Sequence, residues 1–135
     1  MKGTDAQQPI VIPATERSPA VSFDFEAGHF SFSGESYPED AASFFGPLLE
    51  SLRRYLEQGR DVLFEFRLVY FNSSSAKALM NIFLMLEAAA EQGTSVTVNW
   101  RYAADDEAME EFGEDFASDL EHTRFVLCPD AEGAS

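Results

Sequence analysis

Residues 68–83 read LVYFNSSSAKALMNIF, and within this stretch the pattern changes from that of a β-strand to that of an α-helix. The overlapping residues 61–70 are rich in β-branched and aromatic side chains, as is typical of a central, mostly buried strand. The apolar residues after the change recur at helical spacing: Leu79, Ile82, Phe83, Leu86 and Ala90. We therefore predict a central strand that ends near Tyr70 and a helix from about Ser73 to Gln92.

Three serines follow Asn72 at the change from strand to helix. Asn72 or Ser73 is suited to cap the helix, because a short side-chain oxygen can accept from the free N–H groups of the first turn. The same N–H groups and the helix dipole favour negative charge at this end. Serines are common caps, so a purely structural role is one interpretation. The other is a phosphorylation site, because a phosphate here would change the surface without breaking the helix.

Composition narrows the classes of function. The chain has 135 residues and a formal net charge of -15, which fits one acidic domain and argues against binding to nucleic acid or anionic membranes. Cys128 is the one cysteine, and His29 and His122 lie far apart in the sequence, so we expect no disulfide and no metal cluster. The chain begins without a signal-peptide pattern and has no apolar run of roughly 18 residues. We therefore expect a cytoplasmic protein with protein partners and no membrane insertion.

The remaining segments complete an alternating pattern. Residues 21–34 alternate apolar and polar side chains around a short glycine-containing link, which predicts a β-hairpin. A helix is predicted over 38–58, strands over 94–102 and 123–127, and a third helix over 105–120. The expected core stripe of this third helix consists of Met109, Phe112, Phe116 and Leu120.

This order predicts the α/β class: a single domain with an N-terminal β-hairpin, then alternating helices and strands in a mainly parallel sheet with three main helices. We expect a flexible lead-in over residues 1–18, in which residues 10–12 could add an edge strand, the domain over 19–128, and a tail over 129–135. The three serines would lie at the carboxyl ends of the strands, where function collects in such sheets.

The chain lacks the common catalytic signatures GxSxG, GxxxxGK[ST] and GxGxxG. Ser73 and Lys77 lie one helical turn apart and resemble a serine–lysine nucleophile pair, but that chemistry needs a desolvated lysine. We expect this pair to be solvated, and we predict no catalytic residues and no cofactor.

One strip of the predicted helix differs from its core side. At ~100° per residue, Ser73, Lys77, Met80 and Leu84 fall on the same strip, away from the core-facing residues. Another helix could cover Met80 and Leu84. The alternative is a partner-binding patch with a phosphorylatable hydroxyl at its edge.

The block Tyr70-Phe71-Asn72-Ser73-Ser74-Ser75-Ala76-Lys77 resembles the SiaC family of bacterial regulatory phosphoproteins. Residues 34–41 (GESYPEDA) and 105–113 (DDEAMEEFG) add to the resemblance, which covers roughly residues 15–126. It implies a STAS-like fold, similar to anti-sigma-factor antagonists. It also implies partner switching, in which a cognate kinase would phosphorylate the hydroxyl residue after the Asn and a PP2C-type phosphatase would remove the phosphate. By the same resemblance, the unphosphorylated form would bind and activate a diguanylate cyclase, which favours biofilm or aggregation through cyclic-di-GMP.

By position, the resemblance makes Ser73 the phosphoacceptor, with Ser74 and Ser75 as rivals. From the helix strip we infer the partner contacts, which are Tyr70, Asn72, Lys77, Met80 and Leu84. The expected function is thus a non-enzymatic phosphorylation switch. The alternative is a STAS-like scaffold or anti-sigma-type antagonist that binds a different kinase or sensor and no cyclase.

Overall fold

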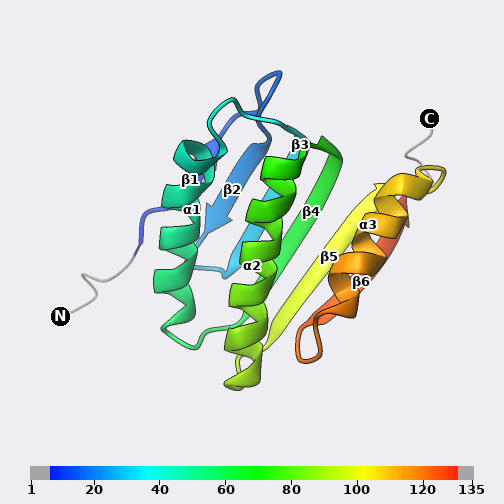
Figure 1. Ribbon diagram of the computed structural model, residues 1–135. Coiled ribbons are helices and arrows are strands. Elements are labelled where there is room, and N and C mark those ends of the chain that lie inside the picture. The colour runs from blue at the N-terminus through cyan, green and yellow to red at the C-terminus, as the bar shows by residue number, and fades with distance from the viewer. Residues whose placement is uncertain (1–6, 131–135) are drawn as a thin grey trace.

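Six strands form one sheet in which they lie side by side in sequence order, β1 to β6. The computed structural model describes residues 7–130, and Figure 1 shows their arrangement. The strands are β1 (Ile10–Ile12), β2 (Ala20–Asp24), β3 (His29–Ser36), β4 (Val62–Phe71), β5 (Val96–Ala103) and β6 (Arg124–Asp130). The helices are α1 (Ala41–Leu56), α2 (Ser73–Glu91) and α3 (Glu107–Ser118).

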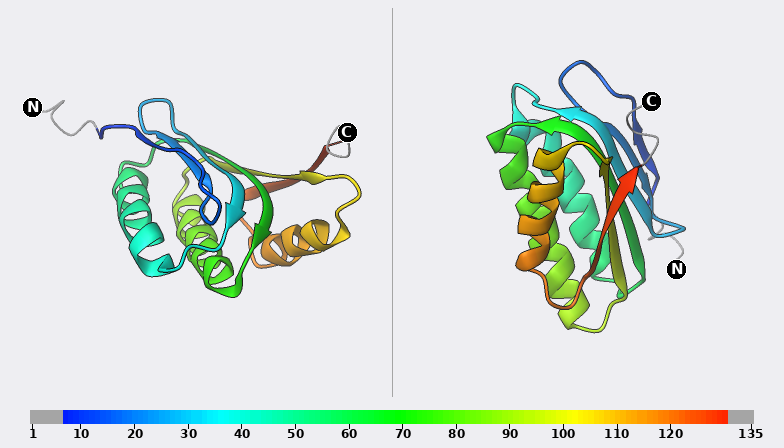
Figure 2. Two further views of the ribbon diagram at one scale, coloured as in Figure 1. Left: turned by 90° about the horizontal axis from the view of Figure 1, so that it is seen from above. Right: turned by 90° about the vertical axis from the view of Figure 1, so that its right-hand side faces the viewer.

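The first three strands pair antiparallel, and β3 to β6 pair parallel. Each helix therefore connects two neighbouring parallel strands, and each connection steps in the same direction across the sheet. Right-handed connections that all progress in one direction across a parallel sheet must place their helices on the same face of that sheet. Figure 2 shows all three helices on one side of the sheet. The predicted fold class, with its hairpin, mainly parallel sheet and three helices, is confirmed.

The core lies between the sheet and the helices and is built largely from aromatic rings. Phe64 and Phe66 of β4 stack at 4.6 Å between ring centroids, and Phe66 lies 5.7 Å from Trp100 of β5. The α2 side chains expected to face the core are buried: Leu79, Ile82, Phe83, Leu86 and Ala90. The spacing of the apolar residues therefore predicted correctly which side of α2 faces the core.

Strand β4 is central, but it is deeply buried on one face alone. Its buried residues alternate with partly or fully exposed ones, including Glu65 and Arg67. On the open face the Glu65 carboxylate accepts from Asn99 Nδ2 at 2.9 Å and from Arg101 Nε at 2.8 Å. The hydrogen bond from Arg101 is the largest cause of the lowered pKa of Glu65. A strand whose sequence is almost continuously apolar, such as β4, can therefore be covered by helices on one face only.

Strands lie at both ends of the described part. Strand β1, in which Ile10 pairs with Phe23, is the edge strand that the sequence allowed within the lead-in, and residues 1–6 lie outside the described part. Strand β6 continues to Asp130, two residues into the segment expected as a tail, and residues 131–135 also lie outside.

Helix α1 begins at Ala41 rather than at residue 38, because Asp40 is its cap and accepts from the Ser43 N–H at 3.1 Å. Within residues 7–130, none of the helices combines the length and the apolar character needed to cross a bilayer.

Candidate functional site

The serine cluster lies where β4 ends and α2 begins, at the carboxyl edge of the parallel strands (upper edge in Figure 1). The N-termini of all three helices point to this edge. The expected position of the serines relative to the sheet is therefore confirmed by the structure.

Asn72 is the cap of α2. Its side-chain oxygen accepts from the Ser75 N–H at 2.9 Å, and its backbone carbonyl accepts from the Ala76 N–H at 2.9 Å. Its own N–H donates to the Ser36 carbonyl at 3.1 Å, which ties the start of α2 to the end of β3. Of the two caps that the sequence allowed, the structure selects Asn72. Ser73 is the first helical residue, so its hydroxyl is not used for capping.

The three serines differ in accessibility. Ser73 and Ser74 are exposed, whereas Ser75 is fully buried. The Ser75 hydroxyl lies 2.7 Å from the hydroxyl of Ser36, which is also buried, and the two share a hydrogen bond. A kinase would have to open the junction between β3 and α2 to reach Ser75. Ser73 and Ser74 therefore remain as the accessible hydroxyl groups.

A groove of about 350 Å³ runs between α1 and α2 beside the serines. Its α1 side contains Ala41, Ala42, Phe45, Gly46 and Leu49, and its α2 side contains Ser74, Lys77, Ala78 and Asn81. Lys77 is the one charged residue among those that line it. The groove thus combines an apolar α1 wall with a single cation near the start of α2.

The residues expected to contact a partner differ in their exposure. Leu84 is 51% exposed on the outer side of α2, whereas Met80 is partly buried against the core. Lys77 lies in the groove toward α1. Tyr70 is 50% exposed at the end of β4 and contacts Tyr37 edge-on at 5.7 Å between ring centroids. Tyr70, Asn72 and Lys77 lie near the start of α2, whereas Leu84 lies about three turns further along the helix.

A change of register in β4 determines where Tyr70 lies. Gly34 of β3 pairs with Leu68, but the next residue of β3, Glu35, pairs with Tyr70, so β4 has one extra residue. A bulge of this kind reverses the face to which the following side chains point. Tyr70 is consequently exposed and Phe71 is buried. Residue alternation alone does not reveal this shift.

Phe112 of α3 was expected in the core but is 42% exposed, which corrects that prediction. Its ring contacts Phe71 at 4.8 Å between centroids. Met109 and Phe116 of the same stripe are buried as predicted. Phe112 thus packs against the end of β4 while much of its ring remains exposed.

Glu87 and His122 form a cluster that the sequence analysis missed because the two residues lie far apart in the chain. The Glu87 carboxylate accepts from the backbone N–H groups of Glu121, His122 and Thr123 at 2.9–3.1 Å and lies 2.8 Å from His122 Nδ1. Glu91 is near enough to complete a three-residue group of possible metal ligands. The oxygens of Glu87 already accept four N–H groups, so the cluster serves to hold the α3–β6 loop on α2.

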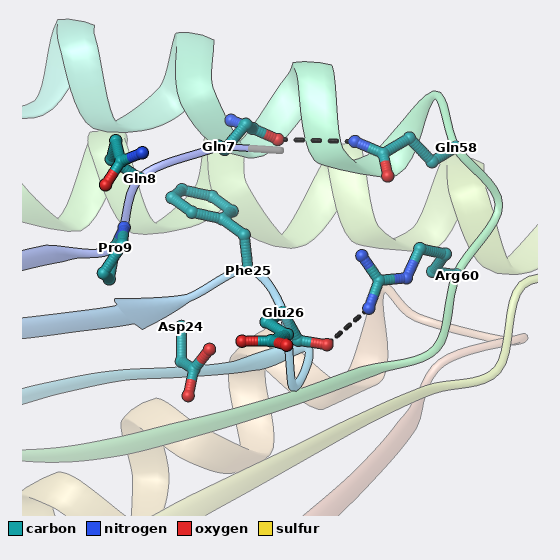
Figure 3. A pocket seen from close by; sticks show the side chains of 8 residues that line it. All are labelled: Gln7, Gln8, Pro9, Asp24, Phe25, Glu26, Gln58 and Arg60. Carbon is teal, nitrogen blue, oxygen red and sulfur yellow. Dashed lines mark hydrogen bonds between the residues drawn. The ribbon is translucent and has the colours of Figure 1, made fainter. Parts of the chain in front are cut away.

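A second hollow of about 380 Å³ lies at the opposite end of the sheet, between the N-terminal segment and the end of α1 (Figure 3). The Arg60 guanidinium donates to the Glu26 carbonyl there, and Gln58 donates to Gln7 at 3.5 Å. Its lining residues include no serine, cysteine, histidine or lysine that could act as a nucleophile or an amine base. The serine cluster is therefore the stronger candidate site.

Comparison with known proteins gives consistent matches. A model for the SiaC family regulatory phosphoprotein matches residues 12–130. An uncharacterized protein of Pseudomonas aeruginosa (strain UCBPP-PA14) is 38% identical over 109 residues, which are 80% of this chain and 86% of that protein.

Solved structures agree with these matches. Apo-SiaC from Pseudomonas aeruginosa has a TM-score of 0.82 at 33% identity, over 90% of this chain and 99% of that chain. A chain from the crystal structure of the diguanylate cyclase SiaD in complex with its activator SiaC, also from Pseudomonas aeruginosa, has a TM-score of 0.86 at 34% identity. This match covers 90% of the present chain and 99% of the other.

Proposed function

Because this chain belongs to the SiaC family of regulatory phosphoproteins, we propose that it is a non-enzymatic switch whose partner is selected by phosphorylation of Ser73. In this proposal the unphosphorylated protein binds and activates a diguanylate cyclase in the cytoplasm. A cognate kinase adds the phosphate and a PP2C-type phosphatase removes it.

The observation that carries this proposal is the position of Ser73. It is exposed, it is the first residue of α2, and its hydroxyl is free because Asn72 supplies the cap. The first-turn N–H groups have no acceptor within the helix, and they favour a negatively charged group. A phosphate on Ser73 would therefore be tolerated by the fold while it changes the charge of the surface.

The surroundings of Ser73 support protein binding. Tyr70 and Leu84 are each about half exposed, at 50% and 51%, and lie on opposite sides of Ser73 along the chain. Exposed aromatic and aliphatic side chains of this kind are suited to anchor a partner. The complex of a related SiaC with the diguanylate cyclase SiaD favours a cyclase over a different kinase or sensor as that partner.

Substitution of Ser73 tests the assignment. Ser73→Ala should abolish phosphate incorporation by the cognate kinase and retain cyclase binding. Ser73→Asp should weaken binding by roughly 1–3 kcal/mol, the scale of one uncompensated charge at an interface. Peptide mapping after the kinase reaction, and calorimetry with the cyclase, measure the two effects.

Ser74→Ala is the matched control, since Ser74 is the other exposed serine of the cluster. It should incorporate phosphate as the unmodified protein does. If Ser73→Ala still incorporates phosphate and Ser74→Ala does not, Ser74 is the acceptor and the assignment to Ser73 is wrong.

A further inference from the structure

Lys77 lies one helical turn after Ser73 and carries a positive charge. It is exposed, it is the one lysine or arginine in α2, and it lines the α1–α2 groove. Among residues 7–130, no carboxylate lies within 4.0 Å of its ammonium group. Of the seven other lysine and arginine residues within 7–130, five are paired with a carboxylate or bound to a backbone carbonyl: Arg17, Arg53, Arg60, Arg67 and Arg101. Lys77 is thus available for an acceptor that the unmodified protein does not present.

The spacing of Ser73 and Lys77 suits an ion pair. Residues four apart on a helix lie about 40° apart around the axis and face each other across one turn. The favourable orientation places the anion at the earlier position and the lysine at the later one. A phosphate on Ser73 would meet this requirement, and it would carry a charge of about -1.5 to -2.

Two carboxylates near this end, those of Asp40 and Glu39, are already engaged. Asp40, which precedes the α1 wall of the groove, accepts from the N–H and the hydroxyl of Ser43 at 3.1 and 2.8 Å. Glu39 pairs with Arg17 at 2.9 Å. Among the described residues that line the groove Lys77 is the only cation, so it is the residue placed to neutralise a phosphate here.

We propose that Lys77 holds the phosphate of Ser73 and thereby determines how the modified surface differs from the bare one. This inference rests on the proposed phosphorylation of Ser73. In the unmodified protein Lys77 is exposed and lines the α1–α2 groove, where a partner can contact it. In the modified protein it turns toward the phosphate, so phosphorylation changes the groove as well as the start of α2.

The test uses the full chain with phosphoserine encoded at position 73, so that no kinase is needed. Titration by ³¹P NMR measures the second pKa of the phosphate. This pKa should be lower in the phosphorylated native sequence than in Lys77→Ala by about 0.2–0.4 units, which is the equivalent of an i,i+4 ion pair. The difference should shrink in 1 M NaCl, where exposed charges are screened.

Two variants separate a specific role from a general change of charge. Lys77→Arg should restore the lowered pKa, because it retains the cation. Arg54→Ala removes one exposed cation near the far end of α1 and should leave the pKa unchanged. Equal pKa values in the native sequence and Lys77→Ala, or an equal shift in Arg54→Ala, would overturn the proposal.

Cyclase binding by the same proteins is measured separately. For each protein we compare the cyclase affinity of the unphosphorylated form with that of the phosphorylated form. If this ratio is smaller in Lys77→Ala than in the native sequence, the result supports a role of Lys77 in partner selection. If the pKa depends on Lys77 but neither form binds a cyclase, the phosphate contact stands and the proposed function fails.

Discussion

A single side chain, Glu87, joins the C-terminal part of α2 to the loop between α3 and β6. Partial burial raises the pKa of its carboxyl, but hydrogen bonds from the His122 ring and from the backbone N–H groups of His122 and Glu121 outweigh this and lower the pKa to about 2. The hydrogen bond to Glu87 in turn raises the pKa of His122 above 6.5. Both charges therefore stabilise the folded state over a defined range of pH.

The pH dependence of stability follows from these two shifts. The Glu87 contribution is complete above pH 4.5 and is lost as the pH falls toward about 2. The His122 contribution is complete below pH 6.5 and is lost as the pH rises through its raised folded pKa. Glu87→Gln should therefore cost on the order of 2–3 kcal/mol in the free energy of unfolding at pH 7, and much less near pH 2. His122→Ala should lower the unfolding temperature more at pH 5.5 than at pH 9.

Urea denaturation across pH measures the first effect, and thermal unfolding measures the second. A cost of Glu87→Gln that does not fall with pH would show that shape and not charge holds the loop. A pH-independent cost of His122→Ala would show that its ring acts only by packing.

At the scale of the element, α3 is held against the sheet by a close approach at Gly113. A Cβ atom there would lie 2.5 Å from Trp100 Cδ1 and 2.5 Å from Leu127 Cδ2. The Trp100 indole also donates to the Met109 carbonyl at 2.9 Å, one turn earlier on the same helix. A side chain at 113 would therefore push α3 away from both strands.

Gly113→Ala should destabilise the protein by about 1–3 kcal/mol, because overpacking outweighs the better helix propensity of alanine. Gly46→Ala is the matched control, since Gly46 also lies inside a helix and has no atom within 4 Å of an added Cβ. Its effect should stay within about 0.5 kcal/mol, because the gain in propensity is offset by the restriction on a residue before Pro47. Equal free energies of unfolding for both variants would exclude the packing explanation.

At the scale of the whole molecule, charge is strongly unbalanced. The chain has 24 acidic and 9 basic residues, and α3 contributes Glu107, Glu110, Glu111, Glu114 and Asp115 within one helix. Like charges three or four residues apart repel each other, and a large net charge destabilises a compact state. The proposed phosphate would add to this charge at the carboxyl edge of the sheet.

Salt should therefore stabilise the native protein. Raising NaCl from 10 mM to 300 mM at pH 7 should increase the unfolding temperature by a few degrees, because the Debye length falls below the spacing of exposed charges. Scanning calorimetry measures the shift. Glu110→Gln with Glu114→Gln should reduce the salt response. An unfolding temperature that decreases with NaCl would show that attractive ion pairs dominate the balance.

Local patterns in the sequence were enough for the order of elements, the fold class and the core side of α2, because each depends on periodicity within one segment. They also placed the serines at the start of a helix, and the motif around Asn72 indicated the family. They were insufficient for Phe112, which has the spacing of a core residue but is 42% exposed where it contacts Phe71 at the end of β4. They could not reveal the position of Tyr70, which depends on one extra residue in the pairing of β4 with β3.

By itself, the sequence determined that a strand leads into a helix at Asn72 and that hydroxyl groups follow it. The tertiary structure alone decided which of those hydroxyl groups is buried, since the hydroxyl of Ser75 hydrogen-bonds to that of Ser36, which belongs to another element. It likewise decided that Lys77 lies in a groove with α1 and that Glu87 holds the α3–β6 loop. Such contacts join segments far apart in the chain, and only the packing of the whole sheet and its helices brings them together.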